Sequence, residues 1–151
     1  MKIYFASDHA GFELKEKLII FVRDLGYEAV DKGASALNLD DDYPDFIALA
    51  ASEVSKDKEA KGIILGGSGE GEAMVANRFP NVRAVAWYGE SMDIIKLSRE
   101  HNDANVLSIG ARFVDEENAK EAVKLWLETS FSGDARHVRR IKKIERIAYN
   151  R

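Results

Sequence analysis

Residues 61–78 read "KGIILGGSGEGEAMVANR" and join an apolar, strand-like run to a segment that looks helical. The run 61–67 is almost entirely apolar, which is typical of a strand buried on both faces of a parallel sheet. Four glycines lie within the six positions 66–71, between the strand and the helix. A strand, a loop and a helix in this order form the repeating unit of an α/β fold.

The same alternation extends along the rest of the chain. Four further strand-like runs occur at 2–7, 27–33, 83–89 and 106–112. Helix-like segments occur at 11–26, from Pro44 or Asp45 onward, at 91–100, at 116–128 and from about Gly133 to Tyr149. Five strands alternating with helices predict one domain over residues 1–151, with a parallel sheet covered by helices on both faces.

Composition excludes several classes of protein. The chain has 151 residues, a formal net charge of −4 at pH 7 and no cysteine. The lack of cysteine excludes disulfides, thiolate zinc sites and thiol nucleophiles, and three histidines without HExxH spacing argue against any zinc site. The charge gives no reason to expect nucleic-acid binding, and no apolar run approaches the ~20 residues of a membrane span. The start does not read as a signal peptide, so we expect a cytoplasmic protein.

Polar side chains follow the predicted strands where a ligand would bind. In parallel α/β sheets, ligands collect beyond the carboxyl ends of the strands. Asp8 and His9 follow the first predicted strand, the glycine loop follows the third, and Arg112 ends the fifth. Ser7 or Asp8 could instead cap the following helix.

The glycine loop fits an anion better than a nucleotide. A dinucleotide fingerprint beginning at Gly67 would place Glu72 where the third glycine belongs, and no Walker-type Gly-Lys-Ser/Thr follows. Backbone N–H groups in such a loop can hold a phosphate or an oxyanion that forms during a reaction. A carboxylate would repel a phosphate, but beside an oxyanion Glu72 makes sense as a base that takes a proton from carbon. Glu72 could also be a first-turn glutamate favoured by the helix dipole.

Two further groups of polar residues lie in the second half of the chain. "REHNDAN" places His101 and Asn102 at the end of a helical stretch, where such residues often act as terminators. In the tail, "RHVRRIKKIERIAYNR", Arg136 and Arg140 share a helical face, and with His137 they suit a phosphate monoester. A solvated basic face and a weak nucleic-acid arm remain alternatives for the tail.

The same tail also carries an apolar stripe. Val138, Ile141 and Ile144 would lie on one side of the terminal helix. Such a stripe favours packing against a second subunit.

Together, these candidates amount to a carboxylate base, an oxyanion cradle, a histidine and a phosphate clamp. Proton transfer on a phosphorylated sugar needs this set of groups.

Five motifs occur in order across nearly the whole chain: "SDHAGFELK", "DDDYPDF", "GGSGEGE…ANR", "REHNDANVLSIGAR" and "RHVRR". In this order they resemble the ribose-5-phosphate isomerase B family of sugar-phosphate isomerases (RpiB/LacAB). The resemblance implies a three-layer α/β/α sandwich with a five-stranded parallel, Rossmann-like sheet and a C-terminal helix. It also implies a homodimer, which could pair into tetramers, with active sites shared between subunits and no metal or organic cofactor.

Many members of that family carry a catalytic cysteine at the position of Gly66, in a context like "CGTG", whereas this chain reads "GGSG". It is similar to a second branch of the family, in which a glutamate six positions further on is the base. That glutamate is Glu72 here. Glu70 adds a second carboxylate to the loop, which could raise the pKa of Glu72 by repulsion or compete for its role.

The resemblance implies a role for each remaining candidate. His101 would open the sugar ring by acid–base transfer. The enediolate oxygen would be stabilised by Ser68 and by the amides of Gly67, Gly69 and Gly71. The hydroxyls would be held by Asp8, His9 and Asn102, with Tyr43 lining the pocket. The phosphate would be bound by Arg112, Arg136, His137 and Arg140, some of them from the partner subunit.

The implied reaction interconverts ribose 5-phosphate and ribulose 5-phosphate through a cis-enediolate, a step of the pentose phosphate pathway. Isomerisation of another sugar phosphate (allose or galactose 6-phosphate, or a tetrulose phosphate) is an alternative within the family. A non-catalytic sugar-phosphate sensor and a nucleotide-binding module are alternatives from other classes.

Overall fold

The computed structural model describes residues 1–149, which contain one five-stranded sheet. Its strands are β1 (Lys2–Ser7), β2 (Glu28–Asp31), β3 (Lys61–Gly66), β4 (Ala84–Trp87) and β5 (Val106–Gly110). Neighbouring strands are parallel throughout, in the order β2-β1-β3-β5-β4. The predicted class of fold, an α/β protein with a five-stranded parallel sheet, is confirmed.

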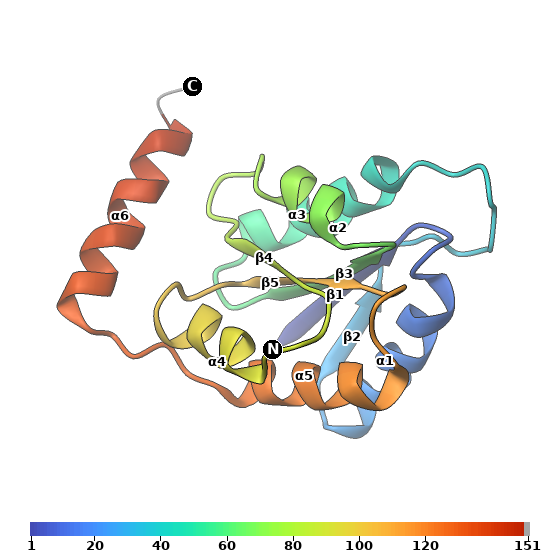
Figure 1. Ribbon diagram of the computed structural model, residues 1–151. Coiled ribbons are helices and arrows are strands. Elements are labelled where there is room, and N and C mark those ends of the chain that lie inside the picture. Colours follow the sequence, from blue (N-terminus) through green and yellow to red (C-terminus); the bar gives the residue numbers. More distant parts are fainter. Residues whose placement is uncertain (150–151) are drawn as a thin grey trace.

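Helices cover both faces of this sheet. They are α1 (Phe12–Asp24), α2 (Tyr43–Lys56), α3 (Glu70–Ala76), α4 (Met92–Glu100), α5 (Glu116–Glu128) and α6 (Ala135–Tyr149). Figure 1 shows α2 and α3 on one face and α1, α4 and α5 on the other, which gives three layers. The last helix, α6, extends away from this body (Figure 1).

The strands are buried on both faces because their apolar side chains alternate between two cores. Phe5, Ile63 and Leu65 pack in the core beneath α1, α4 and α5. Their neighbours Ala6 and Ile64 pack in the second core, beneath α2 and α3. Complete burial of an isoleucine or leucine side chain stabilises a fold by roughly 1.5–3 kcal/mol. The apolar run that begins at residue 61 thus serves two cores at once.

The order of the strands creates a site for a ligand. The strand β1 pairs with β2 on one side and with β3 on the other, so the chain reverses direction across the sheet between β1 and β3. Ser7 pairs with Leu65, and Gly66 pairs with Gly110. The loops that follow β1, β3 and β5 therefore leave the same edge of the sheet side by side. Such a switch point is where open α/β sheets bind ligands.

Element bounds differ from expectation by one or two residues. The helix α2 begins at Tyr43 instead of Pro44 or Asp45, and α6 begins at Ala135 instead of near Gly133. Gly133 has a φ of 70°, which is not helical, and Asp134 Oδ1 accepts a hydrogen bond from the Arg136 N–H at 3.0 Å. Asp134 therefore closes the first turn, as helix-capping carboxylates do. Within residues 1–149, no helix has both the length and the apolar character required to cross a bilayer.

Candidate active site

A cleft of about 540 Å³ lies beyond the carboxyl ends of β1, β3 and β5. Four segments of the chain line it, with the residues Asp8, His9, Ala10, Tyr43, Gly67, Ser68, Gly71, Glu72, Arg112 and Phe113. Sequence reasoning missed Ala10 and Phe113, although each is the neighbour of a residue that it named. The structure thus brings the first-half candidates together with Arg112 in one place.

The glycine loop divides into a part that lines the cleft and a part that anchors it. Gly67, Ser68 and Gly71 line the cleft. Gly69 has a φ of 80°, in the left-handed region that favours glycine, and its carbonyl accepts a hydrogen bond from Ser108 Oγ at 2.6 Å. A Cβ at Gly69 would lie 3.1 Å from the backbone of β5. Gly69 therefore fixes the loop against β5.

Glu72 is buried, with 4% of its surface exposed, although it lies in the first turn of α3. Its carboxyl group turns back toward β3, because a Cβ added to Gly66 would overlap with it. Burial raises the pKa of Glu72 above its ordinary value, and the charge of Asp8 adds to the shift, while backbone N–H groups of Glu72 and Gly69 partly oppose it. Repulsion by Glu70, which is exposed, is not among these causes.

Asp8 and His9 occupy the turn between β1 and α1. Asp8 Oδ1 accepts a hydrogen bond from the Ala10 N–H at 3.0 Å, so Asp8 closes this turn as well as lining the cleft. His9 Nδ1 lies 2.6 Å from Asp41 Oδ1. Asp8, His9 and Asp41 offer ligand atoms within 4.8 Å of one another, a spacing that could hold a metal ion. The contact between His9 Nδ1 and Asp41 Oδ1, however, already uses one of the ligand atoms of each residue.

Arg112 brings positive charge to the cleft. It follows β5, and its N–H donates to the Gly67 carbonyl at 3.2 Å. The guanidinium lies over Gly67, since a Cβ there would be 3.1 Å from Arg112 Nη1. Tyr43 covers Gly71 in the same way, with its hydroxyl 2.7 Å from the position of a Cβ. Both glycines are therefore places where a larger residue packs directly on the backbone.

The other predicted site residues lie at the opposite edge of the sheet. His101 ends α4 and Asn102 follows it, just before β5 begins at Val106. Arg112 comes after the far end of β5, and the five residues of this strand span roughly 17 Å. Arg136, His137 and Arg140 lie on α6, and the Ser132 N–H just before this helix donates to the Glu100 carbonyl at 3.1 Å, which ties the start of α6 to the end of α4. One chain therefore holds two separate groups of candidates.

Two histidines hold the second group together. The rings of His101 and His137 stack, with centroids 4.3 Å apart and planes 18° apart. His137 is 5% exposed, and burial lowers its pKa below the ordinary value. The neighbouring charges of His101 and Arg136 lower this pKa further. The stack joins the end of α4 to the first turn of α6.

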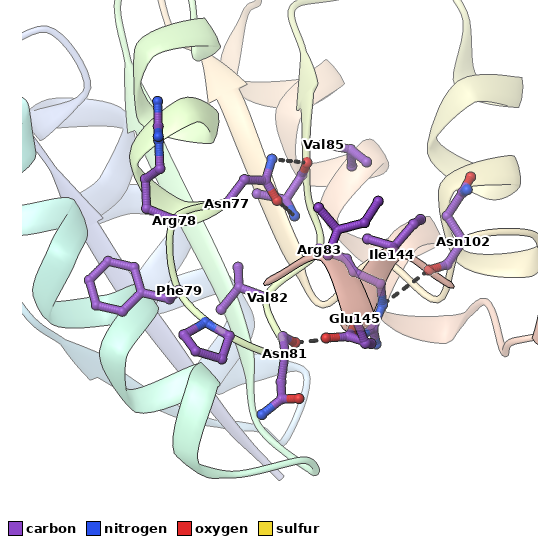
Figure 2. Close-up of a pocket in the computed structure, with 13 residues that line it drawn as sticks. Asn77, Arg78, Phe79, Asn81, Val82, Arg83, Val85, Asn102, Ile144 and Glu145 are labelled. Atoms are coloured by element: carbon purple, nitrogen blue, oxygen red, sulfur yellow. Dashed lines mark hydrogen bonds and ion pairs between the residues drawn. The ribbon is translucent and has the colours of Figure 1, made fainter. Parts of the chain in front are cut away.

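Arg83 makes a second link between α6 and the turn after His101. Its Nη1 forms an ion pair with Glu145 Oε1 at 2.7 Å. Its Nε donates to the carbonyls of Asn102 at 3.2 Å and Asp103 at 3.0 Å. Figure 2 shows Arg83 between Glu145 and Asn102, in a groove of about 400 Å³ that α6 forms with residues 77–85.

The helix α6 presents apolar side chains outward. Ile144 is 49% exposed and Ile147 is 62% exposed. Of the predicted stripe, only Ile144 is exposed, whereas Val138 and Ile141 are half-buried, and Ile147 adds an exposed side chain that the prediction did not include.

The fold and the cleft are those of an α/β protein with a polar cleft at the switch point of its sheet, where such folds bind ligands. Residues 3–144 match a family model described as Ribose/Galactose Isomerase, and the chain belongs to this family. It is therefore an isomerase.

Named relatives support this assignment. The chain is 42% identical over 142 residues to ribose-5-phosphate isomerase B of Mycolicibacterium paratuberculosis, covering 93% of this chain and 87% of the relative. It is 37% identical over 150 residues to the Escherichia coli protein of that name, covering 99% and 98%.

Solved structures agree with the sequence relatives. Ribose-5-phosphate isomerase B from Mycoplasma genitalium with bound ribulose-5-phosphate superposes with a TM-score of 0.94 at 36% identity, covering 99% of this chain and 97% of the other. The Clostridium thermocellum isomerase B gives a TM-score of 0.91 at 39% identity, covering 99% of both chains.

Proposed function

We propose that this isomerase interconverts ribose 5-phosphate and ribulose 5-phosphate through a cis-enediolate. The observation that carries the proposal is the buried carboxyl group of Glu72 beside the glycine loop. The Mycoplasma genitalium relative, which was solved with bound ribulose-5-phosphate, supports the choice of substrate. We place the reaction in the pentose phosphate pathway and in the cytoplasm.

Glu72 would act as the base. Once the sugar ring is open, Glu72 removes the proton from the carbon next to the carbonyl, and the hydroxyl proton of that carbon passes to the former carbonyl oxygen. The same carboxyl then gives a proton to the neighbouring carbon. A base works best when its pKa lies near the working pH, and burial moves the pKa of Glu72 in that direction. Ser68 and the amides of the loop would stabilise the negative oxygen of the enediolate. One such donor is typically worth about 10²–10³ in rate.

The overlap between Glu72 and a side chain at residue 66 supports this role. A cysteine at that position, which the family resemblance associates with the other branch, would reach the space that the Glu72 carboxyl now fills. A base from residue 66 and a base from residue 72 would thus act from the same point in the cleft. Glycine at 66 is what leaves room for the glutamate.

The second group of candidates would complete the site from another chain. His101 cannot reach the cleft of its own chain, because a strand of roughly 17 Å separates them. In a twofold dimer, each chain would insert His101, Asn102 and the basic residues of α6 into the cleft of the other. His101 would then open the ring, and Arg136, His137 and Arg140 would join Arg112 around the phosphate. The exposed Ile144 and Ile147 would be covered in this homodimer, which could pair further into tetramers.

A proton NMR time course with ribose 5-phosphate in D₂O, without added metal, tests the proposal. We expect ribulose 5-phosphate to form, with deuterium at its C1. Conversion of a six-carbon or four-carbon sugar phosphate instead would change the substrate, since the family model names galactose as well as ribose. Binding of sugar phosphates without any conversion would overturn the proposal in favour of a sensor.

A further inference from the structure

We infer that Asp41 is a positioning residue that fixes the tautomer and orientation of His9 in the cleft. This inference rests on the proposed function, in which His9 holds the hydroxyls of the sugar. Asp41 lies at the end of the loop between β2 and α2, 32 positions from His9 in sequence. The sequence reasoning gave it no role.

Two hydrogen bonds connect one carboxylate oxygen to the same residue. Asp41 Oδ1 accepts from the backbone N–H of His9 at 3.1 Å and contacts His9 Nδ1 at 2.6 Å. The side chain of Asp41 is 5% exposed, against 24% for His9. The carboxylate is therefore a buried support, and the imidazole above it faces the cleft.

The contact determines which ring nitrogen can meet a ligand. An ionised carboxylate only accepts hydrogen bonds, so the Nδ1 that it contacts carries a proton. In the neutral ring the proton then stays on Nδ1, and Nε2 presents a lone pair to the cleft. That lone pair accepts a hydrogen bond from a sugar hydroxyl, whereas the Nε2–H of the other tautomer would donate one to the hydroxyl oxygen.

A purely structural role does not account for Asp41. Its second oxygen, Oδ2, is buried and has no hydrogen-bond partner among the described residues. An unpartnered buried oxygen opposes folding, because the water that it loses is not replaced. For stability alone, a carboxylate at this position is therefore unfavourable. Its contact with His9 gives it a role other than stability.

Four variants and the spectrum of His9 test the inference. Asp41→Ala removes the acceptor, Asp41→Asn keeps one oxygen in place, and Asp42→Ala is the control. Asp42 is the exposed neighbour that makes no side-chain capping bond to α2. We expect Asp41→Ala to lower kcat/KM by roughly 10- to 100-fold, the range for carboxylates that orient metal-binding histidines. Asp42→Ala should stay within about twofold, as for most surface changes, and Asp41→Asn should lie between the two.

The fourth variant, His9→Ala, separates positioning from a general effect on folding. If Asp41 acts through His9, adding Asp41→Ala to His9→Ala causes no further loss of kcat/KM. Losses that multiply in the double variant would overturn the inference.

Nitrogen-15 NMR of the imidazoles gives a readout that does not depend on activity. The chain has three histidines, so His9→Ala assigns the His9 signals. We expect the Nδ1–H tautomer in the wild type and a mixture in Asp41→Ala. An Nε2–H tautomer in the wild type would overturn the inference even if Asp41→Ala fails to fold. Failure of the proposed function would appear separately, as a wild type that holds this tautomer but does not convert ribose 5-phosphate.

Discussion

The imidazole of His101 stacks on that of His137, with ring centroids 4.3 Å apart, at the edge of the sheet opposite the cleft. Because α4 ends at one ring and the other lies in the first turn of α6, the two rings belong to one surface. This surface carries the second group of candidate residues, and the cleft carries the first. If each active site is shared between two chains, the activity that returns when two inactive variants are mixed can be predicted.

Mixing two inactive variants should restore activity. In a dimer of a Glu72→Gln chain with a His101→Ala chain, one site carries both changes and the other carries neither. At equal amounts, half of the dimers are mixed and half of their sites are intact, so about one quarter of wild-type turnover should return. The assay follows turnover after the chains have exchanged, with each variant alone as the control. No recovery after proven exchange would contradict sites that are shared between chains.

Ile147→Glu should dissociate the proposed dimer and abolish activity. A charge on the exposed apolar side of α6 would have to be buried against the partner, which is unfavourable. Ile20→Glu is a matched control, because Ile20 on α1 is 60% exposed and Ile147 is 62% exposed. Light scattering coupled to size exclusion measures the mass. An unchanged mass for Ile147→Glu would contradict the proposed interface.

Glu72→Gln should lower turnover by at least about 10², the low end for a positioned general base. The amide cannot take a proton, so the base is lost. Because the amide has the same shape as the carboxyl group, the affinity for inorganic phosphate should remain nearly unchanged. Glu70→Gln is the control, because Glu70 is an exposed glutamate in the same turn of α3. If Glu70→Gln were the inactive variant, the base would have to be reassigned.

Glu72 should also make stability depend on pH. Between the ordinary glutamate pKa of about 4.3 and the raised pKa of Glu72, the folded chain binds a proton that the unfolded chain does not. The free energy of unfolding therefore falls as pH rises through this interval. Glu72→Gln should raise Tm at neutral pH, and its advantage should shrink as the pH is lowered to the bottom of the interval. Calorimetry at a series of pH values checks this, and a constant difference in Tm would refute it.

Gly66→Ala should inactivate the enzyme without unfolding it. The new methyl group would overlap with the Glu72 carboxyl and force it to move. Gly62→Ala, on the same strand, is the control. Its methyl group would meet a Val106 methyl at 3.1 Å, so the core must adjust while the cleft is untouched. Circular dichroism would monitor the fold, and full turnover in Gly66→Ala would show that the carboxyl lies elsewhere.

The sequence predicted the fold well because apolar alternation is a local signal. The runs around Phe5 and Ile63 needed no knowledge of distant residues, and the order of the loops followed from parallel strands. The burial of Glu72 was not predictable, because the helix pattern alone suggested an exposed first-turn position. Asp41 was missed because its contact with His9 is 32 residues away in sequence. The separation of His101 from the cleft was within reach of the sequence, because a residue that precedes a predicted parallel strand lies at the edge opposite the residues that follow the strand.

Residues 66 and 72 compete for a single volume, and this limits how such a loop can evolve. A chain with cysteine at 66 and glutamate at 72 would have to expel one of the two side chains from the cleft. A chain with glycine at 66 and no glutamate at 72 would have no base there at all. Each single step between the two arrangements therefore passes through a disabled intermediate, so the glutamate loop and the cysteine loop should persist as separate lineages.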